Sequence, residues 1–318
     1  MKKFSKLIVL MLSAVMCLSF VSCGDKTLSD NIRVGSLVGP TGMGLIDLVD
    51  DEKIDLELYQ NPTDAVQKLI ADEIDIACLP SNMGGVLYNK TNGNIQIISN
   101  IVNGVLYIVE HGNSIKSIQD LKGKTIIGSG KGGIPEYALQ ALLENEGLEV
   151  GKDVQVDWVD SHATVAQKVA NMDSAVGLLP EPMVSSITLK SRKVNVALNM
   201  NDLWKNLTGQ ELPMGILVAK KSFIESRPDD VALFMDEVHA SIKDVQTCSD
   251  EIVQKIVDAG IIVDPEVCKE AIPRCALVCY SSDETKAAIG ALYDRLFAIE
   301  PTSIGGKLPG DDIYWGRS

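Results

Sequence analysis

The sequence has no excess of basic residues. Its 318 residues include 29 Lys and Arg against 43 Asp and Glu, which gives a formal net charge of −14 at pH 7. No stretch of the chain gathers Lys and Arg into a basic patch. Because nucleic-acid phosphates repel such an acidic chain, we expect no nucleic-acid partner.

Histidine is scarce, and the cysteines do not fall into pairs. The three histidines, His111, His162 and His239, are scattered, and none stands at metal-ligand spacing from a cysteine. An odd number of cysteines at irregular spacing follows the N-terminal region: Cys78, Cys248, Cys268, Cys275 and Cys279. This pattern predicts no disulfide framework, although the motif CALVC leaves a pairing open beside small buried thiols. We expect no bound metal and no cofactor.

Only the N-terminus carries a long apolar run. The basic residues Lys2, Lys3 and Lys6 precede an apolar stretch over 7–18, which is followed by SFVSCG. A stretch this short with these flanks is typical of a secretory signal and not of a membrane-spanning helix. We predict a signal peptide over 1–22, and removal of its three lysines changes the net charge from −14 to −17.

The tetrapeptide FVSC resembles a bacterial lipobox, in which the cysteine is diacylated and becomes the mature N-terminus. Phe20 stands where such motifs usually have Leu, and ordinary cleavage near Ser22 is the alternative. We predict lipidation of Cys23 and a lipid anchor with a polar tether over 23–30. The mature protein is then extracytoplasmic and reaches the membrane by its lipid anchor only.

Strands and helices alternate along the rest of the chain, which is long enough for two domains. Predicted strands over 32–38, 54–58 and 74–79 are separated by predicted helices over 45–49 and 64–71. Such alternation indicates an α/β fold with a parallel sheet.

The two halves of the chain resemble each other. Residues 61–83 align without a gap with residues 161–183, and the alignment pairs Gln67 with Gln167, Leu79 with Leu179, Pro80 with Pro180 and Met83 with Met183. The repeat predicts two similar α/β lobes. Because open α/β sheets bind ligands at the carboxyl ends of their strands, two such edges would face each other across a cleft.

A glycine-rich turn follows the predicted strand Thr125–Gly128 and precedes a predicted helix that begins near Pro135. Turns of this kind bring backbone N–H groups close to a ligand at the positive end of a helix. Gly128, Gly130 and Gly133 also fit a dinucleotide-binding pattern, with Asp157 at a suitable distance for a ribose contact. NAD is not a routine cofactor outside the cytoplasm, so we favour binding of another ligand.

The last third of the chain changes character. One more strand is predicted over 214–219, and long helices follow over 229–246, 250–259, 265–271 and 283–299. The first of these helices has an apolar stripe at helical spacing, which is typical of core packing. We expect these helices to cover the first lobe.

Several motifs occur together in one order: DLKGK, the strand with its glycine turn, the helix start Pro135-Glu136-Tyr137, and LPEP ending at Pro182. In this combination the chain resembles bacterial ABC-importer substrate-binding proteins, of the type that binds sulfonates, nitrate or thiamine-pyrimidine precursors. The resemblance covers most of residues 31–245. It implies the two-lobed periplasmic-binding-protein type II fold, with the ligand cleft between the lobes.

In this family the chain crosses twice between the lobes, here near Glu110–Asn113 and near Glu211–Pro213. The resemblance therefore implies a discontinuous first lobe over 31–110 and 214–318 and a second lobe over 111–213. It also implies capture of a small molecule by hinge closure, followed by recognition by the ABC permease subunits. We expect a monomer that is not an enzyme.

The candidate ligand contacts lie where predicted strands end and turns enter helices. They are Thr41, Gly42, Ser81, Asn82 and Asn103 in the first lobe, and Ser129, Lys131, Gly132, Gly133, Ser161, His162 and Glu181 in the second. Five of them have a structural alternative: helix N-capping for Ser81 and Ser161, a solvated turn for Lys131, a surface position for His162, and a helix-dipole contact for Glu181.

The charges of these candidates favour different ligands. Lys131 and the glycine turns favour an anion, whereas Asp160 and Glu181 favour a cationic or hydrogen-bond-donating group. A small polar metabolite, anionic or heteroaromatic, fits them, with Tyr137 or Trp204 as stacking partners. The alternative function is an enzyme on the same fold, of the thiamine-pyrimidine or menaquinone-pathway type. The signal peptide disfavours it, and so does the absence of the cysteine-rich loop expected of the former.

Overall fold

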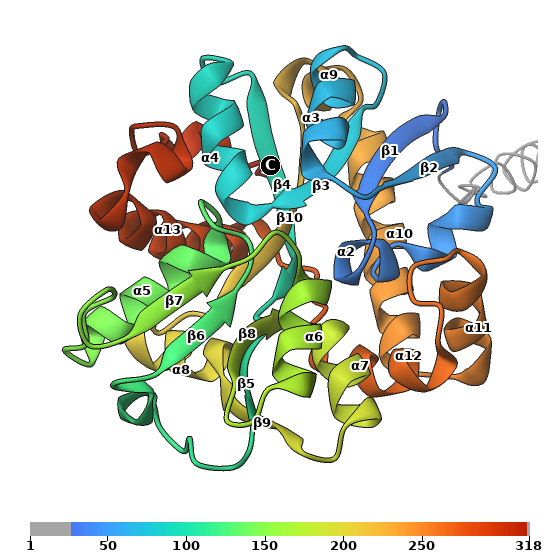
Figure 1. Ribbon diagram of the computed structural model, residues 1–318. Helices are drawn as coiled ribbons and strands as arrows, with labels where there is room; N and C mark the ends of the chain where they lie inside the picture. The colour runs from blue at the N-terminus through green and yellow to red at the C-terminus, as the bar shows by residue number, and fades with distance from the viewer. Residues whose placement is uncertain (1–26, 317–318) are drawn as a thin grey trace, which may run out of the picture.

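Two five-stranded sheets with the same strand order form the two lobes of the molecule (Figure 1). The computed structural model describes residues 27–316, so the predicted signal peptide and Cys23 lie outside the described residues. The first sheet has the order β2-β1-β3-β10-β4 and the second the order β7-β6-β8-β5-β9. This equivalence confirms the internal repeat that the sequence predicts.

The strands are short and mostly buried, as expected for sheets covered by helices. The strands of the first sheet are β1 (Ile32–Leu37), β2 (Ile54–Tyr59), β3 (Ile76–Pro80), β4 (Ile95–Asn103) and β10 (Pro213–Lys220). Those of the second sheet are β5 (Leu106–His111), β6 (Thr125–Gly128), β7 (Gln155–Trp158), β8 (Val176–Pro180) and β9 (Val194–Asn199).

Each sheet is mixed, which corrects the prediction of a parallel sheet. In the first sheet β10 runs antiparallel to both β3 and β4, and in the second β5 runs antiparallel to both β8 and β9. These two strands are the ones that begin directly after the chain has crossed from the other lobe. Each of them therefore starts at the edge of its sheet where the neighbouring strand, β3 or β8, ends.

The first crossing lies earlier than predicted. Strand β5 pairs in the second sheet, so the chain leaves the first lobe at Gly104 and Val105, and the boundary near Glu110–Asn113 was wrong. The second crossing, just before β10, agrees with the position predicted near Glu211–Pro213. The two crossings lie side by side, because the Gly104 N–H donates to the carbonyl of Leu212 at 2.8 Å.

Helices cover both sheets. In the first lobe they are α2 (Pro40–Met43), α3 (Pro62–Ile70), α4 (Ser81–Lys90) and α9 (Lys221–Ser226), and the predicted helix over 45–49 is a 3-10 helix, Ile46–Asp50. In the second lobe they are α5 (Ile134–Asn145), α6 (His162–Asn171), α7 (Met183–Lys190) and α8 (Met200–Thr208). Helices α7 and α8 and strand β9 were not predicted from the sequence.

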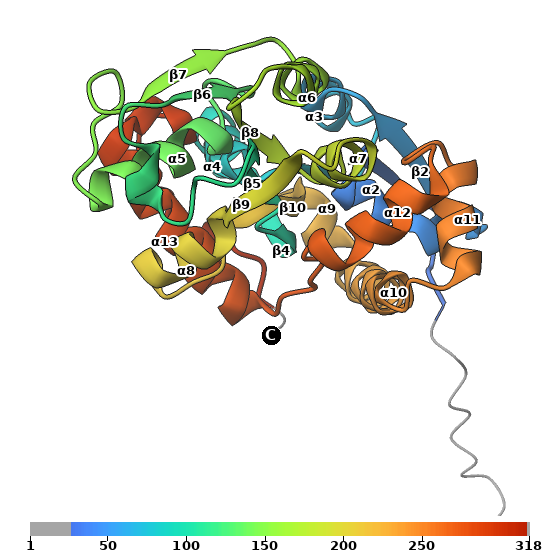
Figure 2. The ribbon, with the colours of Figure 1, turned by 60° about the horizontal axis from the view of Figure 1, so that its bottom comes forward.

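The late helices belong mainly to the first lobe, as predicted. They are α10 (Pro228–Gln246), α11 (Asp250–Asp258), α12 (Pro265–Ala271) and α13 (Ser282–Ile299). The apolar stripe of α10, with Val231, Phe234 and Val238, is buried in a core shared with β1. However, α12 also packs on α7 and α13 on α5, so the C-terminal helices bridge the two lobes (Figure 2).

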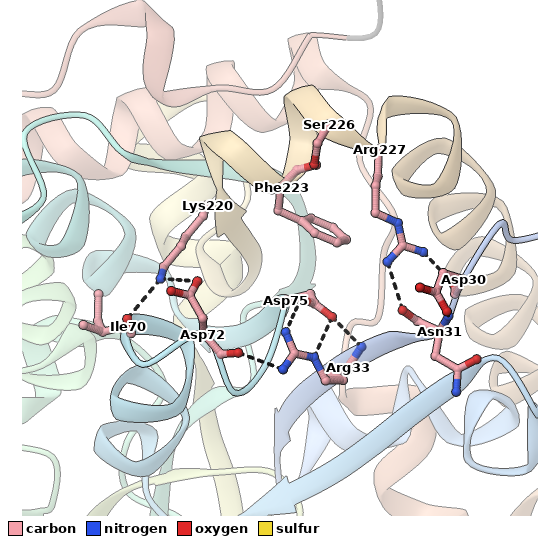
Figure 3. Close-up of polar contacts among 10 residues, drawn as sticks. All are labelled: Asp30, Asn31, Arg33, Ile70, Asp72, Asp75, Lys220, Phe223, Ser226 and Arg227. Atoms are coloured by element: carbon pink, nitrogen blue, oxygen red, sulfur yellow. Dashed lines mark hydrogen bonds and ion pairs between the residues drawn. The ribbon is translucent and has the colours of Figure 1, made fainter.

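The described chain begins against α10. The Ser29 N–H donates to Asp230 at 2.8 Å. The Arg227 guanidinium donates to the carbonyls of Asp30 and Asn31 at 2.6 and 2.9 Å (Figure 3). Arg33, at the start of β1, pairs with Asp75 beside them. These contacts fix the entry of the chain at the end of the first sheet where β1 begins, opposite to the end where β1 and β3 meet the cleft described below.

Candidate functional site

A cleft of about 480 Å³ lies between the lobes, at the carboxyl ends of the strands. Its wall in the first lobe includes the end of β1 at Leu37, the residue Gln60 after β2, and Met214 of β10. Its wall in the second lobe includes the first turn of α6 and the residues that follow β8. This is the edge at which open α/β sheets bind ligands, and most of the lining side chains are apolar.

Thr41 is the polar candidate that lines the cleft from the first lobe. It lies in the short helix α2, and its hydroxyl donates to the carbonyl of Leu37 at 3.1 Å. Gly215 on β10 makes room for it, because a Cβ there would lie 2.7 Å from the Thr41 methyl group. Gly42 is buried beside Thr41 and does not line the cleft, and a Cβ there would lie 2.8 Å from the carbonyl oxygen of Leu37.

Glu181 is the carboxylate of the cleft. It follows β8, and its side chain is 0% exposed. One carboxylate oxygen, Oε2, accepts from the Ser185 N–H in the first turn of α7 at 3.1 Å. The other, Oε1, has no hydrogen-bond partner among the described residues, and Nη1 of Arg274 lies 3.8 Å away. Burial raises the pKa of Glu181, against the opposing effects of the Ser185 hydrogen bond and Arg274.

His162 lines the cleft from the first position of α6. Its Nδ1 lies 2.6 Å from the hydroxyl oxygen of Ser129, which holds the ring in place from the end of β6. Burial lowers the pKa of His162 below its usual value near 6.5, so the ring is neutral at pH 7. Ser129 is itself buried and does not line the cleft.

Of four further polar candidates, three make hydrogen bonds within the protein. Ser161 is exposed and caps α6 by accepting from the Thr164 N–H at 3.2 Å, as its structural alternative predicted. Asn82 donates to the carbonyl of Ser303 at 3.1 Å, and Asn103 donates to the hydroxyl of Tyr280 at 2.7 Å. Ser81 is fully buried in the first turn of α4, where its side chain makes no capping hydrogen bond. None of these four lines the cleft.

The glycine-rich turn does not face the cleft. Lys131 and Gly132 are exposed, and neither they nor Gly133 line the cleft wall. Two N–H groups of the turn are used within the protein, since Gly132 donates to Glu136 at 2.6 Å and Gly133 to the carbonyl of Gly130 at 3.1 Å. These two donors of the predicted anion cradle are therefore not directed at the cleft.

Packing and backbone geometry explain these glycines. A Cβ at Gly128 would lie 2.9 Å from the ring of Trp158, and Gly130 has a φ of +82°, which L side chains rarely adopt. The Asp157 carboxylate, the ribose contact of the dinucleotide alternative, pairs with Lys168 at 2.9 Å. The glycine pattern thus reflects close packing within the protein and the backbone conformation of the turn.

Neither predicted stacking aromatic lines the cleft. Trp204 is 0% exposed in the core of the second lobe, and Tyr137 packs against the same core. The lining residues that sequence reasoning missed include Gln60, Met183 and Met214. Gln60 directly follows β2, and Met183 begins the helix that comes two residues after β8. The rule that ligand contacts follow the ends of strands, here called the strand-end rule, would therefore have included both. Ile261, from the loop between α11 and α12, carries no such signal.

The described residues offer no metal site, since residues 27–316 contain no group of three or more His, Cys, Asp or Glu that could hold an ion. Over the same range no helix has both the length and the apolar character needed to cross a membrane. Cys275 and Cys279 are free thiols, and burial raises the pKa of Cys279 to about 11.

Comparison with known proteins identifies relatives for most of the chain. The family described as NMT1/THI5 like matches residues 50–252. A putative binding protein of Bacillus subtilis strain 168, YtlA, is 26% identical over 155 residues, which are 48% of this chain. That alignment spans only 45% of the length of the Bacillus protein.

Solved structures share the architecture. An ABC transporter protein from Parabacteroides distasonis superposes with a TM-score of 0.78 at 22% identity, covering 91% of this chain and 99% of the other. The periplasmic aliphatic sulphonate binding protein SsuA of Escherichia coli superposes with a TM-score of 0.70 at 15% identity, covering 91% and 93%. At these identities the likeness concerns the fold, which is the periplasmic-binding-protein type II fold expected from the sequence.

Proposed function

Because the chain belongs to the NMT1/THI5-like family, we propose that it is the extracytoplasmic substrate-binding component of an ABC importer. It captures a small metabolite in the cleft by closure of the two lobes and presents it to the permease subunits. The observation that carries this proposal is a cleft of about 480 Å³ lined from both lobes, with Thr41 on one side and Glu181 and His162 on the other.

Hinge closure is consistent with the connections between the lobes. Two short crossings at Gly104–Val105 and near Leu212 join the sheets, and a ligand that contacts both walls favours the closed arrangement by its differential affinity. Among the described residues, the only hydroxyl hydrogen-bonded to a base of the cleft wall is that of Ser129, 2.6 Å from Nδ1 of His162, and Ser129 is buried and does not line the cleft. Binding a ligand requires only contacts from both walls, whereas catalysis would also require reactive groups in the cleft. These residues therefore favour a binding role.

A plug in the cleft tests this proposal. Ala163 is an exposed lining residue in the first turn of α6, so Ala163→Trp fills the cleft without disturbing the core. Thermal-shift and calorimetric screening of the chain from residue 24 onward would use sulfonates, pyrimidines, amino acids and nucleobases. We expect the plug to weaken any hit at least about tenfold, because the ligand must displace a large side chain.

The matched control is Ala287→Trp, which adds the same side chain at an exposed position of α13 away from the cleft. Equal affinity in both variants would place the binding site elsewhere and contradict the proposal. Conversion of a hit to a product would support the enzyme alternative instead.

We further propose that a diacylated Cys23 anchors the protein to the outer face of the cell membrane. The lipobox-like FVSC sequence and the polar tether before Ser29 support this arrangement. Cells that express the full-length chain should incorporate labelled palmitate into wild type and not into Cys23→Ala. Equal labelling of the two proteins would refute the lipid anchor.

A further inference from the structure

The charge of the cleft is unlike that expected of a site for an anion. Among the described residues that line it, the ionisable side chains are Glu181 and His162, and neither Lys nor Arg contributes to the wall. Desolvation lowers the pKa of His162, which disfavours a positive charge on its ring. Lys131, which favoured an anion from the sequence, is exposed on a turn outside the cleft.

Two helices of the second lobe that begin at the cleft, α6 and α7, already have side chains of the protein at their N-termini. The Glu181 carboxylate accepts from the Ser185 N–H in the first turn of α7, so an acidic group of the protein already occupies that position. The Ser161 hydroxyl accepts from the Thr164 N–H in the first turn of α6. At these two helices an incoming sulfonate or carboxylate would find these donors used, with a carboxylate beside it at α7. In the first lobe α2, which also begins at the cleft, has no side-chain cap, but it is only four residues long.

Arg274 does not reverse this balance. It lies outside the cleft wall, 3.8 Å from Glu181, and it makes a closer ion pair of 2.7 Å with Glu270. One guanidinium is thus shared between two carboxylates. The Oε1 atom of Glu181 remains a fully buried acceptor with no hydrogen-bond partner among the described residues, and such an atom is costly to leave unpaired.

We propose that the cleft selects a small ligand with a cationic or N–H-donating group directed at Oε1 of Glu181, and that it rejects sulfonates and other anions. This inference rests on the proposed binding function and specifies its ligand class. The apolar side chains of Leu37, Met183 and Met214 line other parts of the cleft, so the remainder of the ligand is largely apolar. A donor group completes the hydrogen bonding of Glu181, whereas an anion leaves Oε1 unpaired and adds repulsion.

The test uses three probes that share a phenyl ring: benzamidine as the cation, benzamide as the neutral donor and benzenesulfonate as the anion. Calorimetry on the chain from residue 24 onward should give wild-type affinities that decrease in that order, with benzamidine at least about tenfold tighter than benzenesulfonate. The same comparison applies to each hit of the broader screen and its analogues of opposite charge.

Two variants should change this order in opposite directions. Glu181→Gln keeps the shape of the side chain and removes its charge, so it should weaken benzamidine about tenfold or more and strengthen benzenesulfonate. Arg274→Gln removes the nearest cation and should do the reverse. Glu144→Gln, an exposed carboxylate on α5, is the matched control and should leave all affinities unchanged. Thermal unfolding of each variant confirms that it is folded.

The outcomes separate the two proposals. If wild type binds benzenesulfonate or an anionic hit as tightly as its cationic analogue, or if Glu181→Gln leaves the order unchanged, the ligand class is wrong while the binding function stands. If neither the three probes nor any compound of the screen binds wild type, the binding function itself fails.

Discussion

Replacing Gly104 with alanine is expected to destabilise the protein by about 3 kcal/mol or more, because the crossing between the lobes has no room for a methyl group. A Cβ at this position would lie 2.0 Å from Cβ and 2.3 Å from Cγ of Asn201. Real Cβ atoms do not approach each other so closely, so the first turn of α8 or the crossing must move.

Asn201 cannot move without further loss. Its Oδ1 accepts from the Leu212 N–H at 2.7 Å, while the carbonyl of Leu212 accepts from the Gly104 N–H at 2.8 Å. Its amide nitrogen also donates to Glu211. A displaced Asn201 would therefore loosen both crossings at once, and the relative orientation of the lobes depends on them.

Urea unfolding of Gly104→Ala measures the effect. Gly290→Ala is the control of opposite sign, because Gly290 lies within α13, where a new Cβ would lie 4.0 Å from the Tyr314 hydroxyl and have room. Alanine there should stabilise the helix by roughly 0.5–1 kcal/mol. A Gly104→Ala variant within about 0.5 kcal/mol of wild type would show that the close approach at the crossing is not a constraint.

Trp204→Ala is expected to cost about 3–5 kcal/mol of unfolding free energy, the range for a large aromatic side chain removed from a core. Trp204 is fully buried in α8, which packs against α5 in the second lobe. The cavity left behind would lie between these helices, away from the cleft. The loss should therefore appear in the stability of the protein and not as the removal of a ligand contact.

Trp204→Phe is the control, and it should retain most of the stability. The indole Nε1 has no hydrogen-bond partner among the described residues, so phenylalanine gives up packing without breaking a hydrogen bond. Calorimetry should give the same ligand affinity for Trp204→Phe as for wild type. A selective loss of affinity in that folded variant would restore Trp204 as a stacking partner of the ligand.

Local patterns in the sequence predicted much of the fold. The strand Thr125–Gly128 and the helix Pro265–Ala271 have the predicted bounds, since alternation and helical spacing record which side chains are buried. The local sequence does not show which sheet a strand joins. Strands β4 and β5 are separated by two residues and are both buried, so their sequences do not reveal that they belong to different lobes.

The strand-end rule found part of the candidate site. It identified Thr41, His162 and Glu181 as cleft residues, because the topology of an α/β sheet fixes where its loops gather. It could not separate them from Ser81 or Asn82, which follow β3 in the same way. The side chains of these two residues are buried, and that of Asn82 donates to the carbonyl of Ser303 in the C-terminal segment. Which way a side chain turns at a helix start depends on the packing of that helix, and the local sequence does not show it.

The placement of β10 has a consequence for biosynthesis. The second lobe is continuous from β5 to α8, whereas the first sheet needs β10 between β3 and β4, and β10 begins at Pro213. Until the whole insertion and β10 have been made, β4 cannot join the sheet, although β1 can already pair with β2 and β3. We therefore expect the inserted lobe to fold first and its parent lobe to close around the last-made strand.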